Sequence, residues 1–146
     1  MALDVGDKTI GVAISDPMGM TVEPLTVIRR SEGVRADLRA VEALVRERDV
    51  SKIVVGLPIM LGGQESVQAG KVREFAQRLS RRLDIPVVTW DERLTTVEAE
   101  RILIEADQSR AARKRVVDKV AAAIILRSYL AAGGKPDQPI SEDTTQ

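Results

Sequence analysis

The chain has 146 residues, and its 22 basic and 22 acidic side chains give a formal net charge of zero. This length suits one domain with its own core and excludes two stacked catalytic domains. The sequence has no cysteine or histidine, which excludes disulfides, thiol or histidine catalysis, and zinc sites built on thiolate or imidazole. Chemistry is left to carboxylates, hydroxyls, lysine, arginine and the backbone. Attraction to nucleic acid must come from local clusters of charge.

Apolar runs all fall well short of the roughly 18 residues that a membrane span requires. No secretory signal is visible at Met1. We therefore expect a protein that resides in the cytoplasm and has no membrane partner.

The first elements in chain order are two short β-prone runs, Ala2 to Val5 and Ile10 to Ser15. The turn-rich residues 6–9 between them predict a hairpin. A third strand is expected from Thr21 to Arg29, and Pro24 within it indicates the edge of a sheet.

Helical spacing of apolar residues from Gly33 to Asp49 predicts an amphipathic helix, with Ser31 available as its cap. A compact apolar strand follows from Lys52 to Leu57. The apolar face of the next expected helix comprises Val72, Phe75, Ala76, Leu79 and Leu83. A strand from Pro86 to Trp90 then completes a crossover unit with two parallel strands.

The last third of the chain begins with a capping-box pattern at Thr95 to Glu98, which predicts a helix running to about Ala106. An apolar helix is expected from about Val116 to Ala132. A basic connector precedes it and carries Arg110, Arg113, Lys114 and Arg115. We expect the polar tail, residues 133–146, to be disordered, so the domain spans residues 1–132.

Two acids occupy unusual positions. Asp4 lies in a strand that should be central, although it could simply hydrogen-bond the turn at residues 6–8. Asp118 shares a helical face with apolar and small residues, among them Ala122 and Ile125, which favours close docking on a sheet. The alternative is that Asp118 only helps to start the helix.

Asp91 and Glu92 follow a parallel strand, and ligands of open α/β sheets bind beyond the carboxyl ends of such strands. Because side chains alternate along a strand, only one of the two should enter a shared site. The sequence leaves open which one does. Alternatively, both acids could lie in a surface loop without a functional role.

Acids at these three locations would repel one another unless a divalent cation neutralised them. Oxygen ligands without histidine or cysteine point to Mg²⁺ or Mn²⁺. A pair of such ions can activate a water molecule for in-line hydrolysis of a phosphodiester. The sequence therefore favours a metal-dependent nuclease.

The segments 3–13, 56–62, 91–96 and 118–126 together resemble the YqgF/RuvX family, whose members are described as Holliday junction resolvases or pre-16S ribosomal RNA nucleases. The resemblance covers residues 3–130. It implies an α/β, RNase H-like fold with a mixed five-stranded sheet of order 3-2-1-4-5 and helices on both faces.

The resemblance also implies roles for individual residues. Asp4, Asp91, Glu92 and Asp118 would be catalytic, with Asp4, Glu92 and Asp118 as metal ligands. Substrate contacts would come from Lys8, Arg93, Thr95, Thr96, Arg110, Arg113, Lys114 and Arg115. Thr95 could instead be only a helix cap, and the basic run could be only a solvated loop.

The expected activity is endonucleolytic cleavage of structured nucleic acid, with precursor rRNA a better candidate substrate than branched DNA. Ribosomal particles are a further expected partner. The active form is expected to be a monomer or a homodimer. A non-catalytic RNA-binding assembly factor is the main alternative. A nucleotide-binding protein of the actin and sugar-kinase type would need two such domains. Family members usually have more residues before the first acid than the three that precede Asp4, so we expect a natural start upstream.

Overall fold

The computed structural model describes residues 1–59, 66–92, 110–134 and 138–139, and gives only the backbone for residues 110–119 and 138–139. Its strands form one mixed sheet of order β3-β2-β1-β4-β5-β6. The strands are β1 (Ala2–Val5), β2 (Thr9–Ser15), β3 (Val22–Arg29), β4 (Ile53–Leu57), β5 (Val87–Asp91) and β6 (Gln138–Pro139). The helices of the described segments are α1 (Val34–Glu47), α2 (Val67–Arg82) and α4 (Arg110–Ala131).

The order of the first five strands confirms the predicted fold class. β1 and β2 pair as the expected antiparallel hairpin, and β4 lies parallel to both β1 and β5. The two-residue strand β6 is an addition to the predicted sheet. It pairs with the outer edge of β5 and lies within the tail that was expected to be disordered.

β3 is an edge strand, as Pro24 predicts. Pro24 lies opposite Ala13, where the register between β2 and β3 shifts between Val12 and Ala13. A proline cannot donate a backbone hydrogen bond, and the edge of a sheet at a bulge tolerates that loss.

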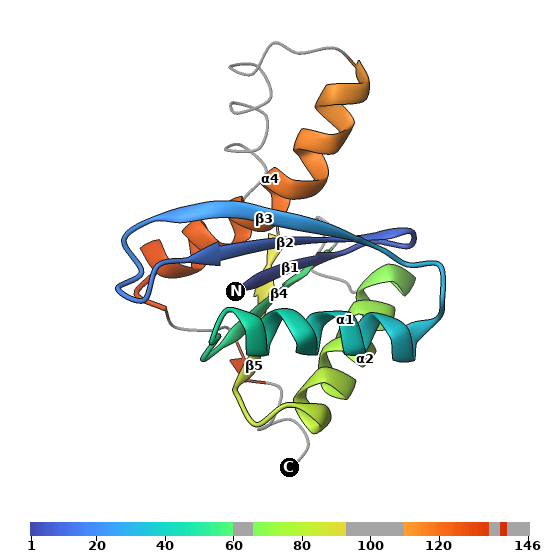
Figure 1. Ribbon diagram of the computed structural model, residues 1–146, viewed down its shortest axis with the longest axis horizontal. Helices are drawn as coiled ribbons and strands as arrows, with labels where there is room; N and C mark the ends of the chain where they lie inside the picture. Colours follow the sequence, from blue (N-terminus) through green and yellow to red (C-terminus); the bar gives the residue numbers. More distant parts are fainter. Residues whose placement is uncertain (60–65, 93–109, 135–137, 140–146) are drawn as a thin grey trace.

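Helices cover both faces of the sheet: α1 and α2 lie on one side and α4 on the other (Figure 1). The larger core joins alternate strand residues to α1 and α2, through side chains such as Leu3, Val55 and Phe75. The second core joins the remaining strand residues, Trp90 for example, to Ile125 and other residues of α4. The alternation of side chains along each strand therefore assigns every strand residue to one of two layers.

The starts of two helices differ from the sequence expectation. The N-cap of α1 is Gly33, at a φ of 93°, so the predicted cap Ser31 is wrong. A glycine adopts this backbone angle without strain. α4 begins at Arg110, so the basic run Arg110 to Arg115 belongs to the helix and the prediction of a connector is wrong.

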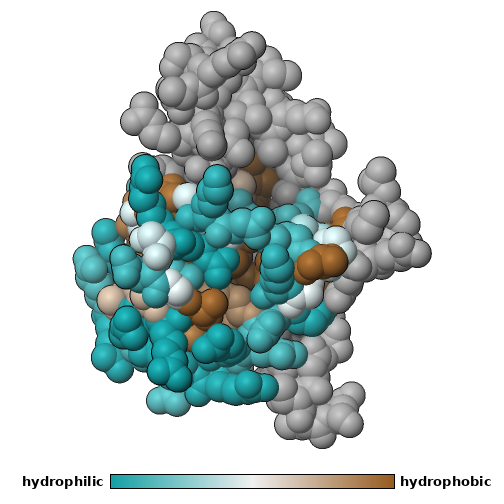
Figure 2. Space-filling view, turned by 90° about the vertical axis from the view of Figure 1, so that its right-hand side faces the viewer, coloured by the Kyte–Doolittle hydropathy of each residue, from teal (hydrophilic) through white to brown (hydrophobic). Residues whose placement is uncertain are grey.

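The predicted capping box at Thr95 and its helix lie outside the described residues. None of the helices in the described part of the chain is long and apolar enough to cross a membrane. Figure 2 shows one face of the molecule, on which hydrophilic side chains predominate and hydrophobic ones appear in small separate patches.

Candidate active site

Asp4 and Glu92 lie on the face of the sheet that α4 covers. Ala2 contributes to the core beneath α4, and Asp4, two residues further along β1, points to the same side. Glu92 lies directly after β5, and its side chain borders the same space beside Gly56 as Ile125 of α4. Asp91 alternates with Trp90 and points to the α2 side, where it is buried. The structure thus decides a question that the sequence left open, since Glu92 is the acid that shares a face with Asp4.

The carboxyl groups of Asp4 and Glu92 are hydrogen-bonded to each other. Burial is the largest of four causes that together raise the pKa of Glu92 to about 8, the others being repulsion from Asp4, the hydrogen bond to Asp4 and repulsion from Asp91. A hydrogen bond between two carboxyl groups requires a proton on one of them. Near neutral pH, with no cation bound, the pair therefore holds one proton. This proton removes one of the two negative charges that would otherwise repel each other.

Gly56 on β4 makes room for the Glu92 side chain. A Cβ atom added at Gly56 would lie 2.7 Å from Oε1 of Glu92 and 3.1 Å from its Cγ, and it would also collide with Ile125. The strand that separates β1 from β5 therefore has no side chain where the Glu92 carboxylate lies. In the sequence Gly56 is recognisable only as part of the family-like segment 56–62, which does not indicate this packing role.

α4 packs closely on the sheet through small residues. Ala13 of β2, Ala122 and Ala123 form a buried cluster, which confirms the expected close docking of this helix on the sheet. The backbone of Asp118 lies one helical turn before Ala122 and well inside α4, which begins at Arg110. Its position argues against the interpretation that it only starts the helix.

The other predicted substrate-binding residues are less constrained. Lys8 is exposed in the turn between β1 and β2. Arg113 and Lys114 lie in the first turns of α4, and only their backbone is described. Arg93, Thr95 and Thr96 lie outside the described residues.

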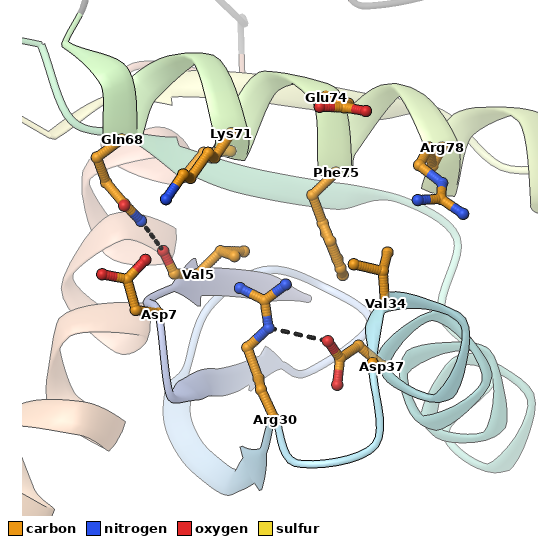
Figure 3. A pocket seen from close by; sticks show the side chains of 12 residues that line it. Val5, Asp7, Arg30, Val34, Asp37, Gln68, Lys71, Glu74, Phe75 and Arg78 are labelled. Carbon is orange, nitrogen blue, oxygen red and sulfur yellow. Dashed lines mark hydrogen bonds and ion pairs between the residues drawn. The ribbon is translucent and has the colours of Figure 1, made fainter.

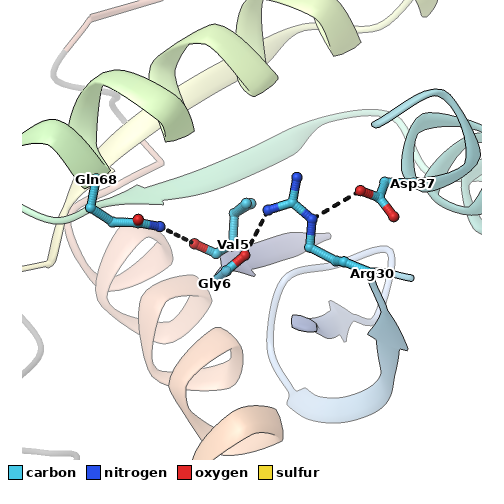
Figure 4. Close-up of polar contacts among 5 residues, drawn as sticks. All are labelled: Val5, Gly6, Arg30, Asp37 and Gln68. Carbon is cyan, nitrogen blue, oxygen red and sulfur yellow. Dashed lines mark hydrogen bonds and ion pairs between the residues drawn. The ribbon is translucent and has the colours of Figure 1, made fainter. Parts of the chain in front are cut away.

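A cluster on the opposite face of the sheet holds the turn that follows Asp4, and the sequence analysis missed it. Gln68 donates a hydrogen bond to the Val5 carbonyl, while Arg30 donates one to the Gly6 carbonyl and another to Asp37 (Figure 4). A signal was present in the sequence, since Asp37 interrupts the apolar stripe of α1 and is buried. A buried carboxylate in such a stripe needs a partner of opposite charge.

Among the described side chains, which exclude Asp118, no three acidic groups gather closely enough to hold a metal ion. Asp4 and Glu92 are the two that meet on the α4 face.

A family model described as "RuvX: Holliday junction resolvase" matches residues 1–132. The chain belongs to the RuvX family. This membership confirms the family that the motifs indicated and, at the level of the family, the expectation of a nuclease that hydrolyses phosphodiesters.

Relatives of this RuvX protein match nearly the whole chain. A protein of Desulforamulus reducens is 49% identical over 92% of this chain and 98% of its own. A protein of Myxococcus xanthus is 46% identical over 98% of this chain and 94% of its own. Both carry the name "Putative pre-16S rRNA nuclease".

Solved structures of RuvC from Thermus thermophilus share the fold of this RuvX protein. One of them, a complex with a Holliday junction substrate, matches with a TM-score of 0.60 at 14% identity, over 94% of this chain and 96% of the other. At that identity the likeness concerns the fold.

Proposed function

We propose that this RuvX protein is a divalent-metal-dependent endonuclease, with Asp4, Glu92 and Asp118 as the ligands of its metal site. The observation that carries the proposal is the hydrogen-bonded pair of Asp4 and Glu92 at the carboxyl ends of two strands. Ligands of open α/β sheets bind at this edge.

The donor groups fit Mg²⁺ or Mn²⁺, because carboxylate oxygens are the ligands that these ions prefer. Two further observations support the fit. The raised pKa of Glu92 reflects negative charge that burial has left unbalanced, and Gly56 leaves space beside the Glu92 carboxylate. A bound ion would stabilise negative charge on the phosphodiester and lower the pKa of the attacking water.

Asp118 completes the site from α4. Ala122 packs against Ala13, and in the hairpin register Ala13 pairs with Ala2 and Gly11 with Asp4. One turn toward the start of α4 from Ala122 corresponds to about two residues along β2. This step would bring position 118 over the row formed by Gly11 and Asp4, which supports Asp118 as a ligand.

Other residues of the chain would support the metal site or contact the substrate. Asp91 is buried at the same edge of the sheet and raises the pKa of Glu92. Its negative charge would favour binding of a cation beside Glu92. Lys8 and Arg93 would contact phosphates, and Thr95 and Thr96 would offer hydroxyl and backbone donors. The basic start of α4, with Arg110, Arg113, Lys114 and Arg115, would lie along the phosphate backbone.

We assign precursor 16S rRNA as the substrate, which ribosomal particles would present in the cytoplasm. The names of relatives at about half identity, "Putative pre-16S rRNA nuclease", support this choice. Branched DNA is the second candidate, because the family model carries the description of a Holliday junction resolvase. Resolution of a junction would require a homodimer with two sites, whereas rRNA cleavage can be carried out by a monomer.

The test is cleavage of a labelled 16S rRNA precursor and of a labelled four-way DNA junction, by the wild type and by Asp4→Asn, with Mn²⁺ or with EDTA. We expect the wild type with Mn²⁺ to cut the RNA in preference to the junction, and Asp4→Asn to cut neither. Cleavage of the junction alone would show that branched DNA, and not precursor rRNA, is the substrate. Equal cleavage by Asp4→Asn, or binding of RNA without metal-dependent cleavage, would refute the nuclease.

A further inference from the structure

The turn that follows Asp4 is held from the face of the sheet opposite the candidate metal site. Arg30 at the end of β3 donates a hydrogen bond of 2.6 Å from Nη1 to the carbonyl of Gly6. Gln68 in the first turn of α2 donates one of 3.3 Å from Nε2 to the carbonyl of Val5. The two carbonyls belong to the two residues directly after Asp4, so three elements converge on the backbone that carries this acid (Figure 4).

Arg30 is itself held in place by several contacts. Its Nε lies 2.9 Å from Oδ2 of Asp37, whose side chain is only 3% exposed. Its backbone N–H donates to the carbonyl of Lys8 at 2.9 Å, and its guanidinium lies over the ring of Phe75, 5.5 Å from the centroid. The planar guanidinium donates to Asp37 and to the Gly6 carbonyl at the same time, so an arginine fixed by Asp37 also holds the turn in position.

Asp4 and Glu92 on the other face explain why the turn after Asp4 would need to be held in place. The side chains of Asp4 and Glu92 are neighbours on that face, and two carboxylates held close together repel each other. Asp4 is the penultimate residue of β1, so little regular structure beyond it resists that repulsion. Metal ligands have to be held within a fraction of an ångström of their working geometry.

We propose that Arg30 and Gln68 are positioning residues, which fix the carboxylate of Asp4 for metal binding by anchoring the carbonyls of Gly6 and Val5. This inference rests on the proposed function and deepens it. It assigns a role in the site to two side chains that lie on the face of the sheet opposite the candidate metal site.

Space beside these side chains makes the inference testable. A cavity of about 320 Å³ is lined by Arg30, Gln68, Phe75 and neighbouring residues (Figure 3). Side chains of similar or smaller size that replace Arg30 or Gln68 would extend into this cavity and not into the packed core. Loss of a hydrogen bond can therefore be studied without overpacking.

The experiment compares Gln68→Leu, Arg30→Met, Arg30→Lys, Asp4→Asn and a control, Arg82→Met. Arg82 pairs with Glu42 across α1 and α2 at 3.3 Å, so the control removes an arginine ion pair that is not part of the hairpin anchor. Each variant is measured for its melting temperature without metal, for the increase in that temperature on adding Mn²⁺, and for kcat and KM of RNA cleavage.

Gln68→Leu and Arg30→Met should lower kcat by about tenfold to 100-fold with little change in KM. They should also reduce the stabilisation by Mn²⁺, because a displaced Asp4 binds the ion less tightly. Arg30→Met additionally leaves Asp37 without its cation and lowers the metal-free melting temperature. Arg30→Lys should restore that temperature through the ion pair but recover only part of kcat, because lysine lacks the second arm of the fork. Arg82→Met should keep the wild-type Mn²⁺ response and kcat.

The outcomes separate the two claims. If Asp4→Asn loses cleavage and the Mn²⁺ response while Gln68→Leu and Arg30→Lys behave like Arg82→Met, the positioning role is refuted and the nuclease stands. If Asp4→Asn keeps both properties of the wild type, the proposed function itself fails.

Discussion

Glu92, directly after β5, hydrogen-bonds Asp4 of β1 across the strand that lies between β1 and β5. β4 separates β1 from β5, and the contact is possible because Gly56 of β4 has no side chain in the way. The pair is electrostatically costly in the absence of a cation. Several measurable consequences arise from this contact.

Asp4→Asn should lower cleavage by at least about 100-fold without lowering the melting temperature. The substitution removes a charge that repels Glu92, so the pKa of Glu92 should fall toward its ordinary value. Asp7→Asn is the matched control, since Asp7 is an exposed acid of the same hairpin. Loss of cleavage in the control as well, or a collapse of the fold in Asp4→Asn, would contradict the assignment.

The metal-free protein should lose stability as the pH rises from about 5 to 8. The pKa of Glu92 is raised from 4.5 to about 8 in the folded state, so within this window the folded protein holds a proton that the unfolded chain has released. The contribution of Glu92 is fully present below pH 4.5 and declines by at most about 1.4 kcal/mol per pH unit.

Glu92→Gln isolates this contribution in chemical denaturation at several pH values. Stability should therefore fall less with pH in Glu92→Gln than in the wild type. Parallel curves for the two proteins would show that Glu92 does not titrate in this range.

Gly56→Ala should impair cleavage and destabilise the fold by about 1–3 kcal/mol. The new Cβ would lie 2.7 Å from Oε1 of Glu92, so the carboxylate has to move. Gly70→Ala on α2 is the control, because its Cβ would meet nothing within 4 Å. Alanine is a better helix former than glycine, so the control should gain about 0.5–1 kcal/mol with cleavage unchanged. Wild-type cleavage by Gly56→Ala would show that Glu92 needs no such niche.

Ala13→Leu should lift α4 from the sheet and cost about 1–3 kcal/mol. Ala13 is fully buried against Ala122 and Ala123, and the displaced helix carries Asp118. Cleavage and the stabilisation by Mn²⁺ should both decrease, measured at a temperature where the variant is folded. Ala131→Leu, at an exposed site near the end of the same helix, should affect neither. An undiminished Mn²⁺ response in folded Ala13→Leu would argue against Asp118 as a ligand.

Local sequence patterns predicted most of the fold. Alternating apolar residues and the turn after Val5 located the hairpin, Pro24 indicated the edge strand, and helical spacing located α1 and α2. These features depend on interactions between residues close in the chain. The start of α4 was misplaced, because a run of basic side chains resembles an exposed loop when its backbone hydrogen bonds are not visible.

By itself the sequence determined which acids stand at strand ends, that no thiol or imidazole is available as a ligand, and to which family the chain belongs. Only the tertiary structure decided that Glu92, and not Asp91, shares a face with Asp4, that Gly56 clears the space between them, and that Arg30 and Gln68 hold the turn from behind. The physical reason is that these relationships join residues on different strands and helices. Their geometry depends on the register and packing of the whole sheet, which no local pattern specifies.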